Sequence, residues 1–579
     1  MSSLKCWVNN YTMSAKQALN VVLYWHMHQP EYRNLRTGQY HLPWTYLHVI
    51  KDYVDMAAHL ETVPAARAVV NFTPTLLEQI DDYAKQISSY LQHGTAIHDP
   101  LLDALIQPVL PQSGEQRLDL IRQCLRANEE RLINRYPEYH RLADMARWLE
   151  QHPDSIIYIS EQYLADILVW FHLAWLGETV RRSDLRVAQL QKKGAGFNLH
   201  DRNELMRIIG DNVSQVIERY KVLAERGQIE LSVTPYAHPI MPLMLDINST
   251  HEAMPEAPLP MQTNYPGGKQ RVDWHIEQGI KVFEEFFGFR PSGCWPSEGS
   301  VSEETVRMLD QHGFKWLASG ETVLHNSLHA VPNKDKRNLH NAYQYADTSA
   351  RCFFRDDGLS DLIGFTYATW HADDAVANFI NHLENIAASC ENEKDAIVSV
   401  ILDGENAWEY YPENGYYFLN ALYTQLSKHP GINLTTYSDY LQQHPEPRSL
   451  QRLVAGSWVY GTFSTWIGEQ DKNRAWDMLS EAKQACDTQL ASRDFTPQEL
   501  DRILKQLAIC EGSDWFWWFG DYNPSESVSD FDYLYRLQLS NLYMRLCLEP
   551  PNYLTEAFSH GGGGEVATGG TMRRGKQTD

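Results

Sequence analysis

The sequence has no apolar run that approaches the roughly 18 to 20 residues a helix needs to cross a bilayer. Its first 20 residues do not contain a basic segment followed by an apolar one, which is the pattern of a secretory signal. The eight cysteines are scattered and form no CxxC pair, which argues against a disulfide framework. Together these absences predict a cytoplasmic protein with reduced thiols.

Basic residues are also scarce relative to acidic ones. Lys and Arg number 50 against 74 Asp and Glu, which gives a formal charge of −24. Such a charge repels phosphate backbones and anionic lipids, so we expect neither nucleic acid nor a membrane among the partners. Aromatic residues are 12% of the chain. Core packing accounts for many of them, but sugars also stack on aromatic rings, so the composition weakly favours a carbohydrate ligand.

Short apolar runs rich in β-branched residues alternate with helix-like sequence along the chain. Runs of this length without strict alternation suit parallel strands that are buried on both faces. Strands that alternate with helices predict an α/β fold, either a (β/α) barrel or a doubly wound sheet, and seven or eight runs favour the barrel. The runs are residues 20–25, 67–72, 228–234, 293–295, 314–318, 361–366, 395–402 and 433–436.

The longest gap between strand-like runs, between the second and the third, is almost entirely helix-like. No ordinary βα connection needs that length, so we predict a large helical insertion at about 75–225 that could cover the barrel mouth. A second Met at position 13 makes the residues before it either a start-site extension or a disordered arm. The predicted domains are an extension at 1–12, the barrel with its insertion at 13–445, a C-terminal helical domain at 446–558 and a disordered Gly-rich tail at 559–579.

Two histidines and a carboxylate stand at predicted strand ends, where barrel enzymes place their catalytic groups. His26 and His28 follow the first run, and alternation puts them on the same side of an extended segment. Glu230 lies inside the run GQIELSVTPYAH, shortly before His238. Because an unpaired buried carboxylate is costly, Glu230 is either a structural acid bonded to a His or Arg, or a residue that lines the site.

Two further carboxylates follow strand-like runs. Glu298 stands in CWPSEGS, where small neighbours leave room for a substrate, and Asp403 is the first polar residue after the run DAIVSVIL. Asp403 with Gly404 could also be a plain surface turn. Two carboxylates at strand ends suffice for glycoside hydrolysis, because one attacks the anomeric carbon while the other protonates the leaving oxygen and later activates water.

Five motifs in order resemble the characteristic regions of glycoside hydrolase family 57, over roughly residues 20 to 545. They are HMHQP, GQIELSVTPYAHP, GCWPSEGS, VILDGENAW and GSWVYGTFSTWIG. The resemblance implies an incomplete seven-stranded barrel followed by a helical domain, and a retaining mechanism on α-glucans without metal or cofactor.

By the same resemblance, Glu298 is expected to be the nucleophile and Asp403 the general acid/base. The substrate site is expected to include His26, His28, Glu230 and His238. Three motif tryptophans, some of which we expect to stack on sugar, are Trp295, Trp408 and Trp466.

The motifs HQP and WPSEGS favour the α-amylase and amylopullulanase-like members, and hence a hydrolase of α-1,4-linked glucans such as starch, glycogen or maltodextrins. A 4-α-glucanotransferase or an amylopullulanase is the main alternative. A metal-dependent hydrolase or deacetylase could use His26 and His28 with Glu230 or Asp403. A non-catalytic glycan-binding protein would need no paired acids. The sequence does not determine the oligomeric state.

Overall fold

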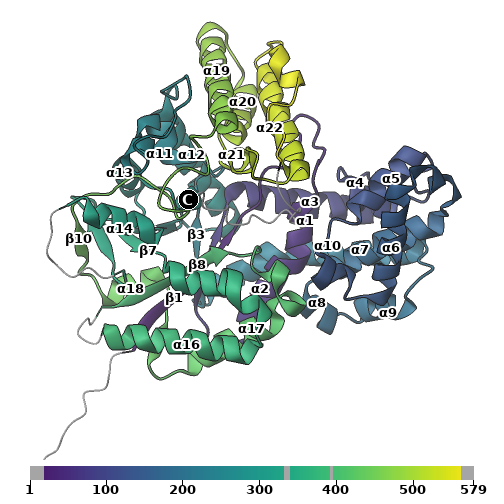
Figure 1. Ribbon diagram of the computed structural model, residues 1–579, viewed down its shortest axis with the longest axis horizontal. Coiled ribbons are helices and arrows are strands. Elements are labelled where there is room, and N and C mark those ends of the chain that lie inside the picture. The colour runs from purple at the N-terminus through teal and green to yellow at the C-terminus, as the bar shows by residue number, and fades with distance from the viewer. Residues whose placement is uncertain (1–17, 332–338, 391–394, 563–579) are drawn as a thin grey trace, which may run out of the picture.

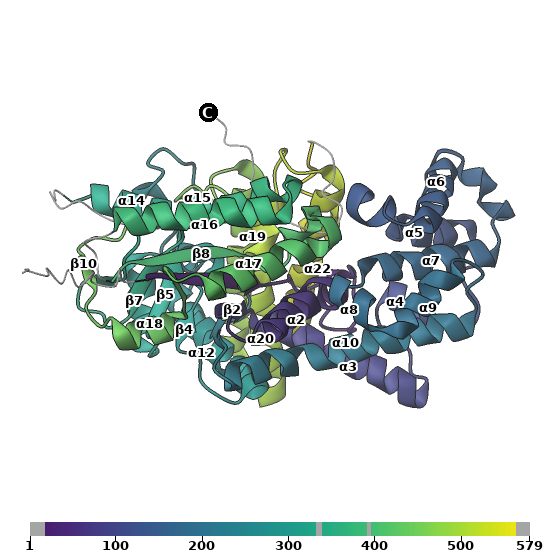
Figure 2. The same ribbon diagram turned by 90° about the horizontal axis from the view of Figure 1, so that it is seen from below.

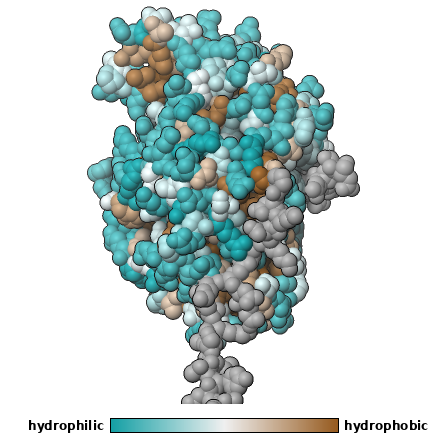
Figure 3. Space-filling model, turned by 90° about the vertical axis from the view of Figure 1, so that its left-hand side faces the viewer, coloured by the Kyte–Doolittle hydropathy of each residue, from teal (hydrophilic) through white to brown (hydrophobic). Residues whose placement is uncertain are grey.

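The computed structural model describes residues 18–331, 339–390 and 395–562. The predicted extension at 1–12 lies outside the described residues, as does most of the predicted tail. The chain forms a sheet surrounded by helices, a helical lobe to one side and a group of C-terminal helices above the sheet (Figures 1 and 2). The face on the left of Figure 1 is largely hydrophilic with separate hydrophobic spots, as expected for a chain with this much charge (Figure 3).

Seven parallel strands curl into an incomplete barrel in the order β7-β5-β4-β3-β2-β1-β8, which confirms the predicted fold class. Every residue of β1 is buried, as expected for a strand covered on both faces. The two outer strands of the series meet at an isolated bridge between Arg355 and Ser399. The strands are β1 (Leu19–Met27), β2 (Ala68–Phe72), β3 (Ile229–Val233), β4 (Gly293–Cys294), β5 (Trp316–Ser319), β7 (Arg351–Phe354) and β8 (Ile397–Asp403).

Three short strands extend this series. The strand β6 (Tyr343–Tyr345) runs antiparallel to β7, and β10 (Arg448–Leu450) pairs with β6. The strand β9 (Ile432–Leu434) pairs with the start of β1. The sheet therefore continues past β7 through β6 and β10.

The prediction of a strand at residues 361–366 was wrong. The segment contains the end of helix α15 (Asp357–Asp361) and a π-helical turn, η6 (Leu362–Thr366). The side chain of Asp356 accepts a hydrogen bond of 2.8 Å from the backbone N of Leu359, which caps the helix and starts the turn. The strand that completes the series is β7, whose run of four residues is too short to stand out in the sequence.

The chain between β2 and β3 folds into helices joined by turns and loops, and it forms the lobe at the right of Figures 1 and 2. Helix α7 is buried at nearly every position and forms the core of this insertion. Among the described helices, none is both long enough and apolar enough to span a bilayer. The α-helices of the insertion are α3 (Pro74–His93), α4 (Pro100–Ile106), α5 (Gly114–Gln123), α6 (Pro137–Gln151), α7 (Glu161–Trp175), α8 (Glu178–Ser183), α9 (Leu185–Lys193) and α10 (Leu199–Glu225).

Aromatic rings fill the interior of the barrel. Tyr437, at the start of helix α18 (Tyr437–Gln443), lies 4.5 Å from Trp316 and 4.2 Å from Phe353 between ring centroids. Tyr24 of β1 contacts Trp295 at 5.7 Å. The interior is therefore a packed core, and in a barrel of this kind the ligand site is expected above it, at the carboxyl ends of the strands.

A buried ionic cluster attaches the C-terminal helices to the barrel. The carboxylate of Glu511 accepts hydrogen bonds from Arg271 at 2.7 Å and from His275 at 2.8 Å, both on helix α12 (Gly268–Phe287). Burial alone would raise the pKa of Glu511, but Arg271 and His275 lower it to about 2. The C-terminal helices are α19 (Gln470–Ser492), α20 (Pro497–Cys510), α21 (Asp514–Trp518) and α22 (Ser525–Arg545).

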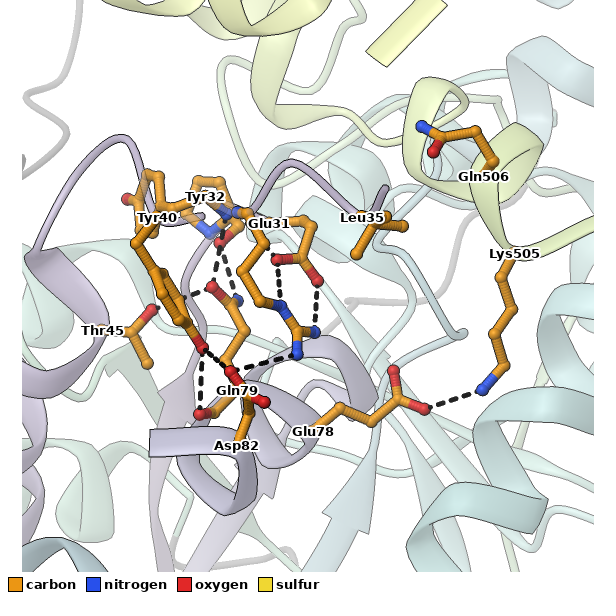
Figure 4. A network of polar contacts seen from close by, with 12 residues as sticks. Glu31, Tyr32, Leu35, Tyr40, Thr45, Glu78, Gln79, Asp82, Lys505 and Gln506 are labelled. Carbon is orange, nitrogen blue, oxygen red and sulfur yellow. Dashed lines mark hydrogen bonds and ion pairs between the residues drawn. The ribbon is translucent and has the colours of Figure 1, made fainter. Parts of the chain in front are cut away.

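A second polar network holds the loop that follows β1 (Figure 4). Arg33 donates to Glu31 at 2.7 Å, and Gln79 of α3 donates to the carbonyl oxygen of Pro30 at 2.8 Å. From the C-terminal side, Gln538 donates to the carbonyl oxygen of Arg33 at 2.8 Å. The loop that carries His28 and Gln29 is thus fixed by both the insertion and the C-terminal helices.

Candidate active site

Glu298 and Asp403 face one cavity from different sides of the barrel. Glu298 lies in a short 3-10 turn, η5 (Ser297–Gly299), directly after β4, and Asp403 is the last residue of β8. Both line a narrow cavity of about 30 Å³. Glu298 is only 5% exposed, whereas Asp403 is half-buried. The fold therefore brings together two carboxyls that are 105 positions apart in the sequence.

The backbone of Glu298 is strained. Its φ of +59° lies in the left-handed region, where a residue other than glycine costs about 1 to 3 kcal/mol and must be held by its surroundings. The backbone N of Trp458 donates to the carbonyl oxygen of Glu298 at 3.0 Å. The indole Nε1 of the same residue donates to Oε2 of Glu298 at 2.9 Å. Trp458 thus fixes both the peptide and the carboxylate.

Burial shifts the pKa of both carboxyls upward. Burial, and then the charge of Asp403, raise the pKa of Glu298 well above its ordinary value, against the opposing hydrogen bond from Trp458. Burial raises the pKa of Asp403 to about 6, although Asn406, which donates to its Oδ2 at 2.5 Å, opposes the shift. Burial thus disfavours the charged form of both carboxyls, and the charge of Asp403 further disfavours ionisation of Glu298.

Three imidazoles form a stack beside Glu298. The ring centroids of His28 and His238 are 3.9 Å apart, and those of His26 and His238 are 5.2 Å apart. Nδ1 of His238 contacts Oγ of Ser513 at 2.8 Å and lies 3.7 Å from Oε1 of Glu298. His238 also has a positive φ of +57°, so two of the residues around this cavity carry backbone strain.

The surroundings of His26 determine its protonation. Nδ1 of His26 lies 2.7 Å from Oδ1 of Asn71, an amide oxygen that can only accept, so Nδ1 carries the proton. Burial, and then the neighbouring His28, lower the pKa of His26 to about 3. His26 is therefore neutral near pH 7, and its Nε2 is a hydrogen-bond acceptor.

Within the part of the chain that the structure describes, His28, His238 and Asp514 form a group whose side chains are of the types that bind metal ions. One ligand atom from each residue lies within 4.8 Å of the others. However, Nε2 of His28 donates to Oδ1 of Asp514 at 2.6 Å, and the rings of His28 and His238 stack with an interplanar angle of 21°. Ring nitrogens bind a metal in the plane of the ring, so two stacked imidazoles do not point to one ion. The geometry fits a hydrogen-bonded cluster better than a metal centre.

A wide cleft opens from the narrow cavity on the side of Asp403. It has a volume of about 590 Å³, and Asp403, Asn406, Trp458 and Trp517 border both spaces. Glu298 borders the narrow cavity and is not among the described residues that line the cleft. The other residues that line the cleft are Asn128, Glu130, Arg131, Arg355, Asp361, Gly364, Phe365, Ala368, Thr369, Leu402, Ala407, Tyr410 and Val459.

Buried polar atoms around the narrow cavity lack partners. Nε2 of His26, Oε2 of Glu405 and Nε1 of Trp518 have no hydrogen-bond partner among the described residues, and all three residues line that cavity. Leaving such atoms unpaired is costly. A set of acceptors with a donor, next to aromatic rings, suits a neutral ligand with many hydroxyls.

Glu230 lies away from these cavities. Oε1 of Glu230 accepts hydrogen bonds from Nε1 of Trp316 at 2.7 Å and from Oγ of Ser438 at 2.6 Å. It stands at the second position of β3, near the amino ends of the strands. Its partners are a Trp and a Ser, not the His or Arg considered from the sequence, and they connect β3 to β5 and α18.

The three motif tryptophans are buried among protein side chains. Trp295 packs against Tyr24 and Trp458, with ring centroids 5.7 and 5.1 Å apart. Trp408 donates to the carbonyl oxygen of Gly404 at 2.9 Å, and Trp466 lies 5.9 Å from Trp517. None of the three is among the described residues that line the cleft or the narrow cavity. Because protein atoms cover these three rings, the contacts in the structure indicate that they support the residues around the site.

Several residues of the site, including Trp458, Asn406, Asp514 and Trp517, were not among the predicted site residues. Trp458 falls inside the fifth motif and Asn406 inside the fourth, but motif membership does not show which side chains point inward. Asp514 and Trp517 come from α21, far along the chain. The aromatic run SDWFWWFG after a helix was the available signal for them.

A pair of carboxyls at the strand ends of an incomplete (β/α) barrel is the arrangement of a glycoside-cleaving enzyme. The family model for glycosyl hydrolase family 57 matches residues 22–451, so the chain belongs to that family. No curated protein matches the sequence closely enough to count as a relative.

Solved structures of the same fold show low sequence identity. A branching enzyme of this family from Thermococcus kodakaraensis, solved with glucose, is 13% identical with a TM-score of 0.55, over 92% of this chain and 89% of that one. An α-amylase from Thermotoga maritima is 14% identical with a TM-score of 0.52, over 92% and 94%. A 4-α-glucanotransferase from Thermococcus litoralis is 15% identical with a TM-score of 0.50, over 91% and 60%. At these identities the likeness concerns the fold.

Proposed function

We propose that this protein is a retaining glycoside hydrolase that acts on α-1,4-linked glucans, with Glu298 as nucleophile and Asp403 as general acid/base. The observation that carries the assignment is the unequal placement of the two carboxyls. Asp403 borders both the narrow cavity and the wide cleft, whereas Glu298 borders the narrow cavity. The leaving group must depart past the general acid. Asp403, which borders the open cleft, is therefore assigned as the acid, and Glu298, on the enclosed side, as the nucleophile.

The mechanism follows from this placement. A sugar bound where the wide cleft meets the narrow cavity presents its anomeric carbon to Oε1 or Oε2 of Glu298, while Asp403 gives its proton to the leaving oxygen. The resulting glycosyl-enzyme is then attacked by water, whose proton passes to Asp403. Trp458 stabilises the carboxylate of Glu298 when it is released.

We assign sugar binding to the buried atoms that lack partners among the described residues. Neutral His26 accepts from a hydroxyl at Nε2, and Glu405 and Trp518 contact further hydroxyls. His28 and His238 position these groups through Asp514 and Ser513. Stacking on sugar is assigned to Trp458 and Trp517, which line both spaces, in place of the three motif tryptophans that protein atoms cover.

The α-glucan substrate rests on family membership and on the printed names of structures with this fold, an α-amylase and a 4-α-glucanotransferase among them. The same site could serve an amylase, a 4-α-glucanotransferase or an amylopullulanase, because these differ in which acceptor or linkage they use. The two histidines and the paired acids fit a glycosidase better than a deacetylase or a binding protein, since the acids face each other across one cavity.

The test is a product analysis after incubation with maltoheptaose. We expect shorter maltooligosaccharides from the wild type and from the control Glu304→Gln, which changes a partly exposed residue of helix α13 (Glu303–Gln311). We expect almost no products from Glu298→Gln, with maltoheptaose binding largely retained. Products longer than the substrate would favour the transferase, and unchanged turnover in Glu298→Gln would refute the assignment of the nucleophile.

A further inference from the structure

A second large hollow lies where the insertion meets the outside of the barrel. It has a volume of about 610 Å³ and lies between α8 and α10 of the insertion and two helices that connect strands of the barrel, α2 (Val54–Thr62) and α17 (Tyr416–Lys428) (Figures 1 and 2). None of the described residues that line this hollow borders the wide cleft or the narrow cavity. The mechanism proposed above therefore makes no use of it.

The hollow continues along helix α10. A neighbouring hollow of about 320 Å³ shares Glu61, Gln215 and Arg219 with it and reaches Arg226. From Asp211 to Arg226 the helix rises about 22 Å, at roughly 1.5 Å per residue. We call the two hollows together the outer groove. Its length suits a chain molecule better than a compact ligand.

The charges of the outer groove cancel, although the chain as a whole carries a formal charge of −24. The lining of the groove has four arginines and four Asp and Glu residues. Arg219 donates to Glu61 at 2.8 Å, and Arg186 donates to Asp184 at 2.7 Å and to Asp211 at 2.8 Å. An anionic ligand would have to displace these carboxylates. A neutral ligand with hydroxyl groups can instead bond to the donors and acceptors that the pairs leave unused.

His59 leaves a buried acceptor in the lining of the groove. Its Nδ1 lies 3.2 Å from Oδ1 of Asn420, an amide oxygen that can only accept, so Nδ1 carries the proton. Burial lowers the pKa of His59, although Asp55 opposes the shift, so the ring is neutral near pH 7. The residue is 1% exposed, and its Nε2 has no hydrogen-bond partner among the described residues. An unpaired buried acceptor is costly, and a hydroxyl group is a donor that would satisfy it.

We propose that the outer groove is a non-catalytic binding site for an α-glucan chain, with His59 and Gln215 among the residues that bond to its hydroxyls. The groove specifies a neutral chain with many hydroxyls, and the choice of an α-glucan rests on the proposed function. Gln215 lies where the two hollows meet, and its side chain is exposed.

A polymer held in the outer groove leaves the catalytic site free for another part of the same molecule. The two sites together then bind a long glucan more tightly than the catalytic site alone, because the second contact is made within one complex. The insertion acquires a function in this account, since α8 and α10 form one wall of the groove.

The experiment measures glycogen binding by affinity electrophoresis in the Glu298→Gln variant, which keeps the polymer intact. Gln215→Leu removes the amide from an exposed position of α10, and His59→Phe removes the unpaired acceptor while keeping a ring. We expect each change to raise the dissociation constant for glycogen by about 2- to 10-fold, as the loss of a hydrogen bond does. Gln116→Leu is the matched control, since it changes an exposed residue of α5 that is not among the described residues lining the groove.

Fluoride release from α-maltosyl fluoride reports the catalytic site separately. With Glu298 in place, Gln215→Leu should release fluoride at the wild-type rate, because so small a donor does not reach both sites. Glycogen binding by Gln215→Leu equal to that of Gln116→Leu would overturn the second site and leave the proposed function intact, whether or not His59→Phe folds. No fluoride release from the wild type would overturn the proposed function, whereas weaker glycogen binding by Gln215→Leu would still support the outer groove.

Discussion

Trp458 and Glu298 are 160 positions apart and make two hydrogen bonds to each other. One joins the indole to the carboxylate at 2.9 Å, and the other joins the peptides at 3.0 Å. The second helps to hold Glu298 at its positive φ, and the first favours its ionised form. A residue of the C-terminal part thus controls both the orientation and the charge of the proposed nucleophile.

Trp458→Phe keeps an aromatic ring and removes the indole N–H. Because a hydrogen bond to a charged group contributes about 1.5 to 3 kcal/mol, we expect kcat/KM to fall about 10- to 100-fold. The pKa of Glu298 should rise further, so the acidic limb of the pH profile should move to higher pH. Trp370→Phe should change neither quantity. A normal rate with an unmoved acidic limb in Trp458→Phe would show that the indole bond is not needed.

The basic limb of the pH profile is expected to report Asp403. The pKa of its carboxyl is raised to about 6, so the protonated acid is lost and kcat/KM falls as the pH rises through that region. Asn406 stabilises the charged form, so Asn406→Ala should raise the pKa of Asp403 and move the basic limb to higher pH. The exposed Asn385→Ala is the control. A shift to lower pH in Asn406→Ala would contradict the assignment.

Glu511 should contribute to stability in a pH-dependent manner. Its pKa in the folded protein, about 2, is below the ordinary 4.5, so its contribution is present above pH 4.5 and is lost as the pH falls toward 2. Glu511→Gln leaves Arg271 and His275 without their carboxylate, and should lower the free energy of unfolding at pH 7 by about 3 to 5 kcal/mol.

Thermal unfolding of the wild type, Glu511→Gln and the exposed control Glu556→Gln, measured from pH 7 to pH 3, tests this expectation. The difference between wild type and Glu511→Gln should shrink as the pH falls below 4.5, because the unfolded wild-type chain then binds a proton at Glu511 that the folded protein, with its lower pKa, does not bind. A difference that stays constant over the whole range would mean that the ionic cluster does not act through the charge of Glu511.

The fold class and the two strand-end carboxyls could be predicted from the sequence. Apolar, β-branched runs and the polar residues that follow them can be recognised without knowledge of distant contacts. Strand β7 was missed because Arg351–Phe354 is too short, and the run at 361–366 was apolar enough to suggest a strand although Asp356 caps a helix there.

Side-chain direction could not be predicted from the motifs. Trp295, Trp408 and Trp466 share motifs with site residues, but their rings are buried, while Trp458 and Trp517 reach the cavities. The side chain of Glu230 bonds to Trp316 and Ser438 near the amino ends of the strands. These outcomes depend on packing between distant segments, which a linear pattern does not contain.

The most direct test of the assigned roles is azide rescue with α-maltosyl fluoride as donor. In Glu298→Gly, azide should enter the space left by the nucleophile and give β-maltosyl azide. In Asp403→Gly, the glycosyl-enzyme still forms on Glu298, and azide should displace it to give α-maltosyl azide. NMR of the isolated azides distinguishes the two anomers. The reverse pattern, with α-azide from Glu298→Gly and β-azide from Asp403→Gly, would contradict the account.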